Sequence, residues 1–222
     1  MSADRFDPAL TTRVDFKRPD AALLTRASGL SSPTVHEAYG RKGALPPEIK
    51  PVAPSFKICG PALTVHSPGG DNLWLHRAIA LAQPGDVLVV YVSGVFDYGY
   101  WGEIMSTGAA SRGLGGLVID GGVRDGALLE GVGLPVFSRG LCIRGTGKDV
   151  GARGWLGAPL LFGDTIVRAG DLIIGDGDGV VSVRAEDIAE VIEASRQRDE
   201  REAAIMQRLR EGETTLGIYN LG

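Results

Sequence analysis

The sequence has few cysteines, and the two that it has stand far apart. Cys59 and Cys142 lack the Cys-x-x-Cys spacing of zinc and redox sites. Two isolated thiols make neither a disulfide framework nor a metal cluster, and they are typical of a reducing compartment. Residues 1–8 also lack the apolar segment of a signal peptide. We therefore expect a cytoplasmic protein.

Long hydrophobic runs and excess positive charge are absent as well. The strongest apolar run covers residues 87–92, whereas a membrane helix needs about 20 residues. The 23 basic residues are outnumbered by 27 acidic ones, which gives a net charge of −4. Binding to phosphate backbones needs a basic surface, so the balance argues against nucleic acid as a partner. We expect neither a membrane nor a nucleic acid to be bound.

Glycine, by contrast, is abundant, with 33 of 222 residues, or about twice its average usage. The glycines have no collagen-like period, which indicates many tight turns between short strands. Nothing in the sequence is typical of an interdomain linker, and 44% hydrophobic residues suffice for one core. We predict an N-terminal arm over residues 1–20, one α/β domain over residues 21–184, and a C-terminal helix and tail over residues 185–222 that packs on another subunit.

Apolar periodicity and turn residues predict the elements of this domain. Pro61 within its strand predicts an edge or a bulge, and residues 175–179 predict a hairpin turn. Asp71 or Asn72 is expected to cap the helix that follows. Helices are predicted over residues 20–27, 32–39, 73–83, 102–112 and 185–210, and strands over 57–65, 87–92, 116–120, 135–138, 141–144, 164–167, 171–174 and 180–183.

Residues 99–125 organise the rest of the chain. A strand over 87–92, a helix over 102–112 and a strand over 116–120 make a βαβ unit, and sites in open α/β sheets lie beyond the carboxyl ends of the strands. The amide groups at the start of the helix attract anions. Glu103, Arg124 and Asp125 could together hold a divalent cation and an anionic substrate there. The alternative is an acidic residue favoured by the helix dipole and a solvated Arg-Asp turn.

An acidic residue, twenty further positions and then Arg-Asp form a family signature, met here by Glu103, Arg124 and Asp125. Further matching segments are Gly-Asp-Asn at 70–72, Pro-Gly-Asp at 84–86, Gly-Tyr-Trp-Gly-Glu at 99–103 and Asp-Gly-Asp-Gly-Val at 176–180. The chain resembles the aldolases that cleave 4-hydroxy-4-methyl-2-oxoglutarate and 4-carboxy-4-hydroxy-2-oxoadipate, and the related regulator of ribonuclease activity A.

The resemblance implies an α-β-β-α sandwich of the swivelling β/β/α type, in an α/β fold, assembled as a homo-trimer or homo-hexamer with the site between subunits. It implies that an acidic residue of a neighbour's C-terminal segment, Glu200 or Glu202, approaches the site. Arg41, in a Gly-Arg-x-Gly segment, would lie near the active site as well; its alternative is a charge that complements a helix C-terminus.

The implied reaction is a retro-aldol cleavage of a 2-oxo acid, which leaves a pyruvate enolate. Decarboxylation of oxaloacetate passes through the same enolate, and Mg²⁺ or Mn²⁺ would hold its charge as a Lewis acid. In this hypothesis Asp125 is the protein ligand of the metal, Glu103 orders its waters, Arg124 polarises a substrate oxygen, and the backbone N–H groups of Gly102, Glu103, Ile104 and Met105 bind the substrate carboxylate.

Two rival hypotheses remain open. A Schiff-base aldolase needs a desolvated lysine, and Lys57 is the one lysine in a predicted strand, without an evident partner. The other rival is a regulator that binds a ribonuclease and needs no chemistry; the intact set of Glu103, Arg124 and Asp125 favours the enzyme. His36, His66 and His76 show no metal-ligand spacing, although any of them could bind a distal carboxylate of the substrate.

Overall fold

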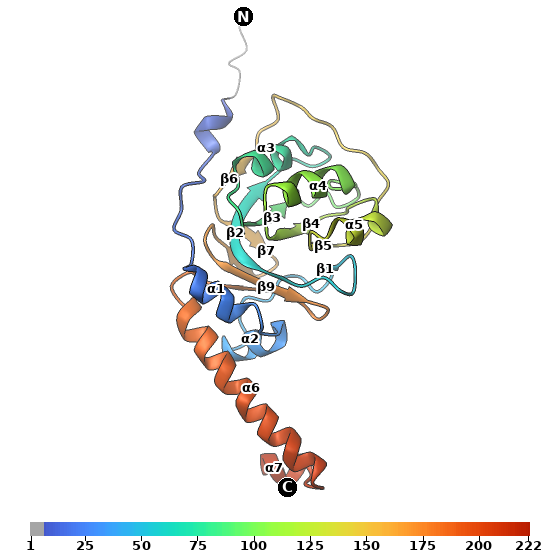
Figure 1. Cartoon of the computed structure of the whole chain (residues 1–222). Helices are drawn as coiled ribbons and strands as arrows, with labels where there is room; N and C mark the ends of the chain where they lie inside the picture. Colours follow the sequence, from blue (N-terminus) through green and yellow to red (C-terminus); the bar gives the residue numbers. More distant parts are fainter. Residues whose placement is uncertain (1–6) are drawn as a thin grey trace, which may run out of the picture.

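The structure, a computed structural model that describes residues 7–222, is built on an eight-stranded mixed sheet with the order β1-β5-β4-β3-β2-β9-β10, and β6 lies beside β2 (Figure 1). Its strands are β1 (Lys50–Pro51), β2 (Ile58–His66), β3 (Val87–Tyr91), β4 (Gly116–Asp120), β5 (Val136–Ser138), β6 (Trp155–Leu156), β9 (Leu172–Asp176) and β10 (Gly179–Val183). A separate antiparallel pair consists of β7 (Leu160–Phe162) and β8 (Thr165–Val167).

Helices cover the strands from two sides. They are α1 (Ala21–Ala27), α2 (Ser32–Ala38), α3 (Leu73–Leu81), α4 (Glu103–Ser111), α5 (Gly126–Val132), α6 (Ile188–Arg210) and α7 (Thr215–Tyr219), preceded by a 3-10 turn at Pro8–Thr11. Helices α3, α4 and α5 lie on β2–β5, whereas α1, α2 and the start of α6 pack against β9 and β10 (Figure 1). The α-β-β-α layering predicted from the resemblance is confirmed.

The layers enclose two hydrophobic clusters. The larger contains Trp74 of α3, Trp101 and most of the parallel strands, and the smaller joins Ile174 of β9 to Ile192 of α6. Neighbouring residues of β9 point into different clusters, since Ile173 belongs to the larger one. This alternation is why β9 has apolar residues on both faces.

The predicted βαβ unit is present as β3-α4-β4. The two strands are parallel, and Tyr91 at the end of β3 lies opposite Asp120 at the end of β4. Apart from the half-buried Tyr91, every residue of both strands is buried, as the continuous apolar runs indicate. Their carboxyl ends therefore open at the same edge of the sheet.

Several local predictions were wrong or missing, and β1, β6, β7 and α7 have no predicted counterpart. Strand β2 lies inside the sheet, and Pro61, which opposes Leu172 of β9, sits just before the pairing with β3 begins at Ala62; its missing N–H falls where the strand changes neighbours. Residues 141–144 form no strand in the described chain, where Leu141 makes an isolated bridge. Helix α5 was missed because its glycines have low helix propensity.

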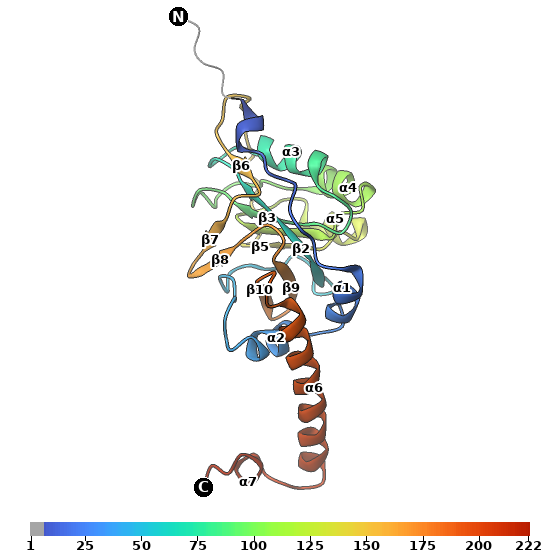
Figure 2. The ribbon, with the colours of Figure 1, turned by 90° about the vertical axis from the view of Figure 1, so that its left-hand side faces the viewer.

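Helix α6 begins and ends close to the predicted positions. Its first half buries Val191 and Ile192, and the Thr34 hydroxyl of α2 donates to Asp199 at 2.9 Å. From Ala203 onwards none of the described residues is buried, and the helix extends away from the domain with α7 at its end (Figure 2). Over the described residues, no helix is long and apolar enough to cross a membrane.

The predicted N-terminal arm is bound to the domain where the structure describes it; its first six residues lie outside the described chain. Arg13 N–H donates to Leu156 O at 3.0 Å. The Arg18 guanidinium binds both carboxylate oxygens of Asp86, at 2.7 and 2.8 Å, and Asp86 is fully buried. Residues 13–18 are hereafter called the strap. A buried, bidentate ion pair attaches the strap to the connection between α3 and β3.

We expect Arg18→Met to lower the free energy of unfolding by about 3 kcal/mol, because it leaves the buried Asp86 carboxylate without its counter-charge. Urea titration of both proteins measures this. Arg26→Met is the matched control, since the Arg26–Glu193 pair is exposed and should contribute less than about 1 kcal/mol. Equal costs for the two variants would contradict the role of the strap.

Candidate active site

The candidate site lies where the segments after β3 and β4 pair with each other. Tyr100 N–H donates to Gly122 O at 3.0 Å, and Arg124 N–H donates to Trp101 O at 2.8 Å. These bonds extend the parallel pairing beyond the strands and carry residues 124–125 to the start of α4. Glu103, Arg124 and Asp125 are thereby brought together, as their positions in the βαβ unit predict.

Asp125 occupies the N-terminus of α4. Its Oδ2 accepts the Glu103 N–H at 3.0 Å, and the Arg124 Nε lies 3.8 Å from the same oxygen. The positive end of the helix dipole and the guanidinium both favour a carboxylate there. Asp125 also adopts a left-handed backbone with φ of 60°, a conformation that is uncommon outside glycine and that concentrates at functional sites.

Gly102 makes this approach possible. A Cβ at this position would lie 2.3 Å from Asp125 Oδ2 and 3.1 Å from Arg124 Cγ. Any other residue would therefore push the Asp125 carboxylate off the start of α4. The glycine of the Gly-Glu pair is required by the close approach of two segments about twenty residues apart.

A cleft of about 150 Å³ opens beside these residues. Arg124 and Asp125 line it with side chains that are 49% and 37% exposed, so both can meet a ligand. Among the predicted amide donors, the Glu103 N–H is taken by Asp125, and its side chain is exposed outside the lining. The lining consists of Asn72, His76, Gly99, Tyr100, Trp101, Gly102, Ile104, Met105, Arg124, Asp125 and Lys148.

The sequence offered His76 as one of three histidines that could bind a distal carboxylate and matched residues 70–72 to the family, but it did not predict that Asn72, His76 and Lys148 form one end of the cleft. Asp71 rather than Asn72 caps α3, since its Oδ1 accepts the Leu73 N–H at 2.8 Å. Lys148 arrives from a distant segment, which Gly147 ties to Gly70 through an N–H···O bond of 2.7 Å. No local sequence pattern predicts a contact between two segments that are more than 70 positions apart.

Burial sets the protonation of this end. It lowers the pKa of His76, and the nearby charge of Lys148 lowers it further, while Asp71 opposes the shift. On balance the shift favours the neutral form of the His76 imidazole. Burial also raises the pKa of Tyr100, whose hydroxyl donates to Val95 O and accepts the Gly70 N–H at 2.8 Å. That hydroxyl joins the start of α3 to the loop that carries Gly102.

Comparison with known proteins assigns the family. The family model described as RraA-like, Aldolase/RraA, matches residues 30–182. The chain belongs to the aldolase/RraA family. A relative from Halalkalibacterium halodurans, provisionally named a 4-hydroxy-4-methyl-2-oxoglutarate aldolase, is 32% identical over 72% of this chain and 76% of its own length. A protein of Methanocaldococcus jannaschii is 31% identical over 78% and 83% of the two chains.

Solved structures agree with this assignment. A protein from Pseudomonas syringae pv. tomato is 28% identical, with a TM-score of 0.79 over 91% of this chain and 94% of its own. Streptomyces coelicolor RraAS2, described as an unusual member of the RNase ES inhibitor RraA family, is 25% identical, with a TM-score of 0.75 over 86% and 98% of the two chains. The family resemblance inferred from the sequence is confirmed.

Asp125 is the residue of this aldolase/RraA family member that could hold a hard divalent cation. No group of three or more His, Cys, Asp or Glu side chains suited to a metal occurs in residues 7–222. Mg²⁺ needs few protein ligands, because it keeps several of its waters and is often bound through one or two carboxylates. The hydrogen bonds described for the Asp125 carboxylate go to Oδ2, which leaves Oδ1 for such a ligand.

Three residues that the resemblance placed near the site lie elsewhere in this chain. Arg41 follows α2 and pairs with Glu37 at 3.2 Å, and α2 lies on the side of the sheet away from α4 (Figure 1). Glu202 pairs with Arg198 at 2.8 Å, and Glu200 is exposed on the same helix. None of the three lines the described cleft, so their predicted roles depend on a second subunit.

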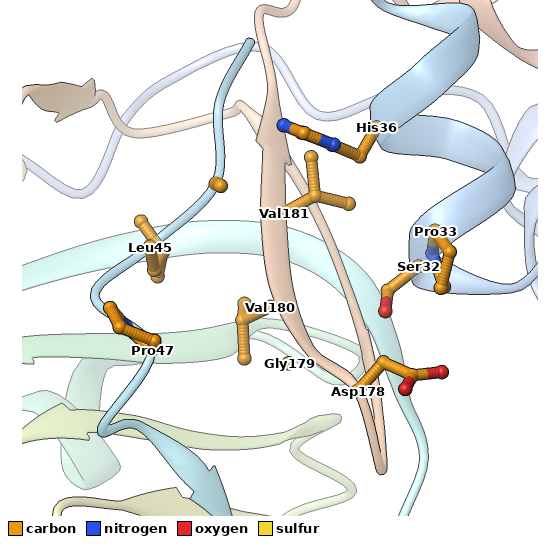
Figure 3. Close-up of a pocket in the computed structure, with 10 residues that line it drawn as sticks. Ser32, Pro33, His36, Leu45, Pro47, Asp178, Gly179, Val180 and Val181 are labelled. Carbon is orange, nitrogen blue, oxygen red and sulfur yellow. The ribbon is translucent and has the colours of Figure 1, made fainter. Parts of the chain in front are cut away.

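A second cavity, of about 260 Å³, lies between α2, residues 44–47 and β10 (Figure 3). Leu45 and Pro47 face it from one side, and Ser32 and His36 from the other. Its walls are mainly apolar, and it contains none of the predicted catalytic residues. The cleft at Asp125 is therefore the candidate active site.

Gly102→Ala is expected to displace the Asp125 carboxylate from the Glu103 amide, because the added Cβ overlaps Oδ2. Loss of this capping bond should lower the free energy of unfolding by about 1 kcal/mol. A crystal structure and urea titration of the variant measure both effects. Gly108→Ala in the same helix, where a Cβ meets no atom within 4 Å, is the control and should stabilise by up to about 1 kcal/mol. An unmoved Asp125 in Gly102→Ala would contradict the argument.

Proposed function

We propose that this chain is a divalent-metal-dependent aldolase that cleaves a 4-hydroxy-2-oxo diacid, either 4-carboxy-4-hydroxy-2-oxoadipate or 4-hydroxy-4-methyl-2-oxoglutarate, to pyruvate and a second 2-oxo acid. The observation that carries the proposal is the Asp125 carboxylate held at the start of α4 beside Arg124, at the mouth of a cleft. The aldolase name of the Halalkalibacterium relative supports it.

The 2-oxo acid end of the substrate fits the residues around α4. The amides of Ile104 and Met105, in the first turn of the helix, would bind its carboxylate. Arg124 would bind the keto oxygen through its guanidinium. Asp125 would hold Mg²⁺ or Mn²⁺, and this ion, when bound, supplies a Lewis acid for the negative charge that develops on the keto oxygen.

The reaction breaks the bond between C3 and C4 of the substrate. An ordered water assisted by a carboxylate would take the proton of the C4 hydroxyl, which becomes the carbonyl of the second product. The electrons of the broken C3–C4 bond pass to C3 and form the pyruvate enolate. A proton added at C3 then gives pyruvate. Oxaloacetate, which loses CO2 to give the same enolate, is the expected side substrate. Arg124 and the fixed amides would lower the barrier of this step, because they already face the negative charge that develops and do not have to reorganise.

We further propose that the protein is a homo-oligomer, a trimer or a hexamer, with the cleft at a subunit boundary. Ile104 and Ile143 are 82% and 93% exposed beside the cleft, and Leu141 is 66% exposed near them. Large exposed apolar side chains that gather in one place mark interaction surfaces. Glu200 or Glu202 of a neighbour's α6 would reach the site in such an assembly.

A non-catalytic regulator of a ribonuclease is the second candidate function. The Streptomyces relative, described as a member of an RNase inhibitor family, favours it. One fold can carry both functions, so the site decides between them. The strained Asp125 and the glycine that admits it favour the aldolase, because a binding surface does not require a carboxylate fixed at a helix start.

Asp125→Asn is expected to lower turnover at least 100-fold, because it removes the charge that holds the metal while keeping the left-handed backbone that asparagine tolerates. Pyruvate release from both diacids and from oxaloacetate, coupled to lactate dehydrogenase, measures this with Mg²⁺, with Mn²⁺ and with EDTA. Wild-type pyruvate release that survives EDTA would contradict metal dependence. No release from any substrate with either metal would favour the regulator.

Deletion of residues 203–222 is expected to reduce the oligomer to smaller species, because this segment carries the exposed Met206, Leu216, Tyr219 and Leu221 and no buried residue. Light scattering coupled to size exclusion measures the mass. Arg18→Met, which lies outside both proposed contact regions, should leave the mass unaltered. An unchanged mass after the deletion would show that the arm makes no subunit contact.

A further inference from the structure

The end of the cleft opposite α4 contains two buried polar atoms without a partner. Among the described residues, Asn72 Oδ1 and His76 Nε2 are both inaccessible and accept or donate no hydrogen bond. Both residues line the cleft, and Asn72 is 5% exposed. An unpaired buried polar atom costs about 1–3 kcal/mol, and native proteins rarely keep one without a purpose.

The amide of Asn72 is fixed in one orientation. Its Nδ2 donates to Tyr100 O at 2.9 Å and lies 3.4 Å from Met105 Sδ. Rotating the amide by 180° would bring its oxygen against the Tyr100 carbonyl, so the assignment of nitrogen and oxygen follows from the network. Oδ1 therefore presents a pure acceptor, and its missing partner must be a donor such as a hydroxyl.

Lys148 supplies a positive charge at the same end. Its segment is held against the start of α3, because Asn72 N–H donates to Gly147 O at 3.2 Å and Asp149 N–H donates to Asp71 Oδ2 at 2.6 Å. Lys148 is thus placed by the backbone on each side of it. Among the residues that line the cleft, Lys148 is the cation at this end, and Arg124 is the cation at the other.

Asn72 Oδ1 accepts a hydrogen bond and Lys148 carries a positive charge at the same end of the cleft. A ligand that suits both has a hydrogen-bond donor next to an anionic group. We propose that Asn72, His76 and Lys148, hereafter the distal pocket, bind the C4 end of the substrate, with the C4 hydroxyl donating to Asn72 Oδ1 and the C4 carboxylate bound by Lys148 and by His76 in the tautomer that carries its proton on Nε2. This inference rests on the proposed function and names the feature by which the substrate is chosen, an α-hydroxy carboxylate.

The hydroxyl contact gives the pocket its selectivity. A ligand with a methylene in place of the hydroxyl leaves Asn72 Oδ1 unpaired and also displaces any water that could pair with it. Sites that hydrogen-bond a hydroxyl reject analogues that lack it far more strongly than apolar pockets reject an extra methylene. Pyruvate and other ligands without a C4 end do not use the pocket at all.

The first test is binding, which needs no turnover. Isothermal titration in Mg²⁺ compares 2-hydroxy-2-methylbutanedioate with 2-methylbutanedioate, which lacks the hydroxyl, on the wild type, Lys148→Met and Lys57→Met. We expect the wild type to prefer the hydroxy diacid at least tenfold, and Lys148→Met to weaken its binding at least tenfold. Lys57, exposed and outside the cleft, is the matched control and should change neither value.

The second test separates the two ends of the cleft. In Lys148→Met, kcat/KM for 4-carboxy-4-hydroxy-2-oxoadipate should fall at least 50-fold, while exchange of the pyruvate methyl protons with D2O, followed by NMR, should stay within twofold of the wild type. A merely unfolded variant would lose both reactions, and its thermal midpoint would show it; Lys148→Gln then replaces it.

Either of two results would overturn the distal pocket: equal affinity of the wild type for the two diacids, or a Lys148→Met protein that binds and cleaves as the wild type does. The proposed function fails by a different result, a wild type that neither cleaves the diacid nor exchanges pyruvate protons. In that case hydroxyl-selective, Lys148-dependent binding would still establish the pocket for an α-hydroxy carboxylate.

Discussion

The geometry of the site depends on the backbone pairing of the segments that follow β3 and β4. Two N–H···O bonds, from Tyr100 to Gly122 and from Arg124 to Trp101, carry the register of the parallel strands past the edge of the sheet. They set the turn that bears Arg124 and Asp125 against the start of α4, and they need glycine where the segments touch.

The sequence predicts those elements that depend on residues close together in the chain, and it does not predict contacts between residues that are far apart in the chain. The β3-α4-β4 unit and the β9-β10 hairpin are encoded by local apolar runs and turn residues, and both were predicted with near-correct bounds. Helix α5, which is rich in glycine, forms because Leu129 is buried, and tertiary burial leaves no local signal. Lys148 was missed for a related reason: its segment is held to the start of α3 by the backbone bond from Asn72 N–H to Gly147 O, which no local sequence pattern specifies.

The cleft joins two kinds of electrostatic control. At the α4 end, the helix dipole and Arg124 hold a carboxylate that would otherwise be free to move, so charge is fixed by charge. At the other end, burial favours the neutral form of His76, and polar atoms are left unpaired. The first arrangement suits a reacting centre, and the second suits recognition of a ligand. Because the two ends of the cleft are separate, a family with several functions can change the residues of one end without changing those of the other.

The strap adds a consequence for how the chain reaches and leaves its folded state. Residues 13–18 are synthesised early, but their partners, Asp86 and Leu156, follow only after long intervening segments. Closing so large a loop is entropically expensive until the sheet exists. We therefore expect the strap to dock after the rate-limiting step of folding, and contacts made that late act mainly on the rate of unfolding. The buried ion pair at Arg18 would then govern the lifetime of the native state more than the speed of its formation.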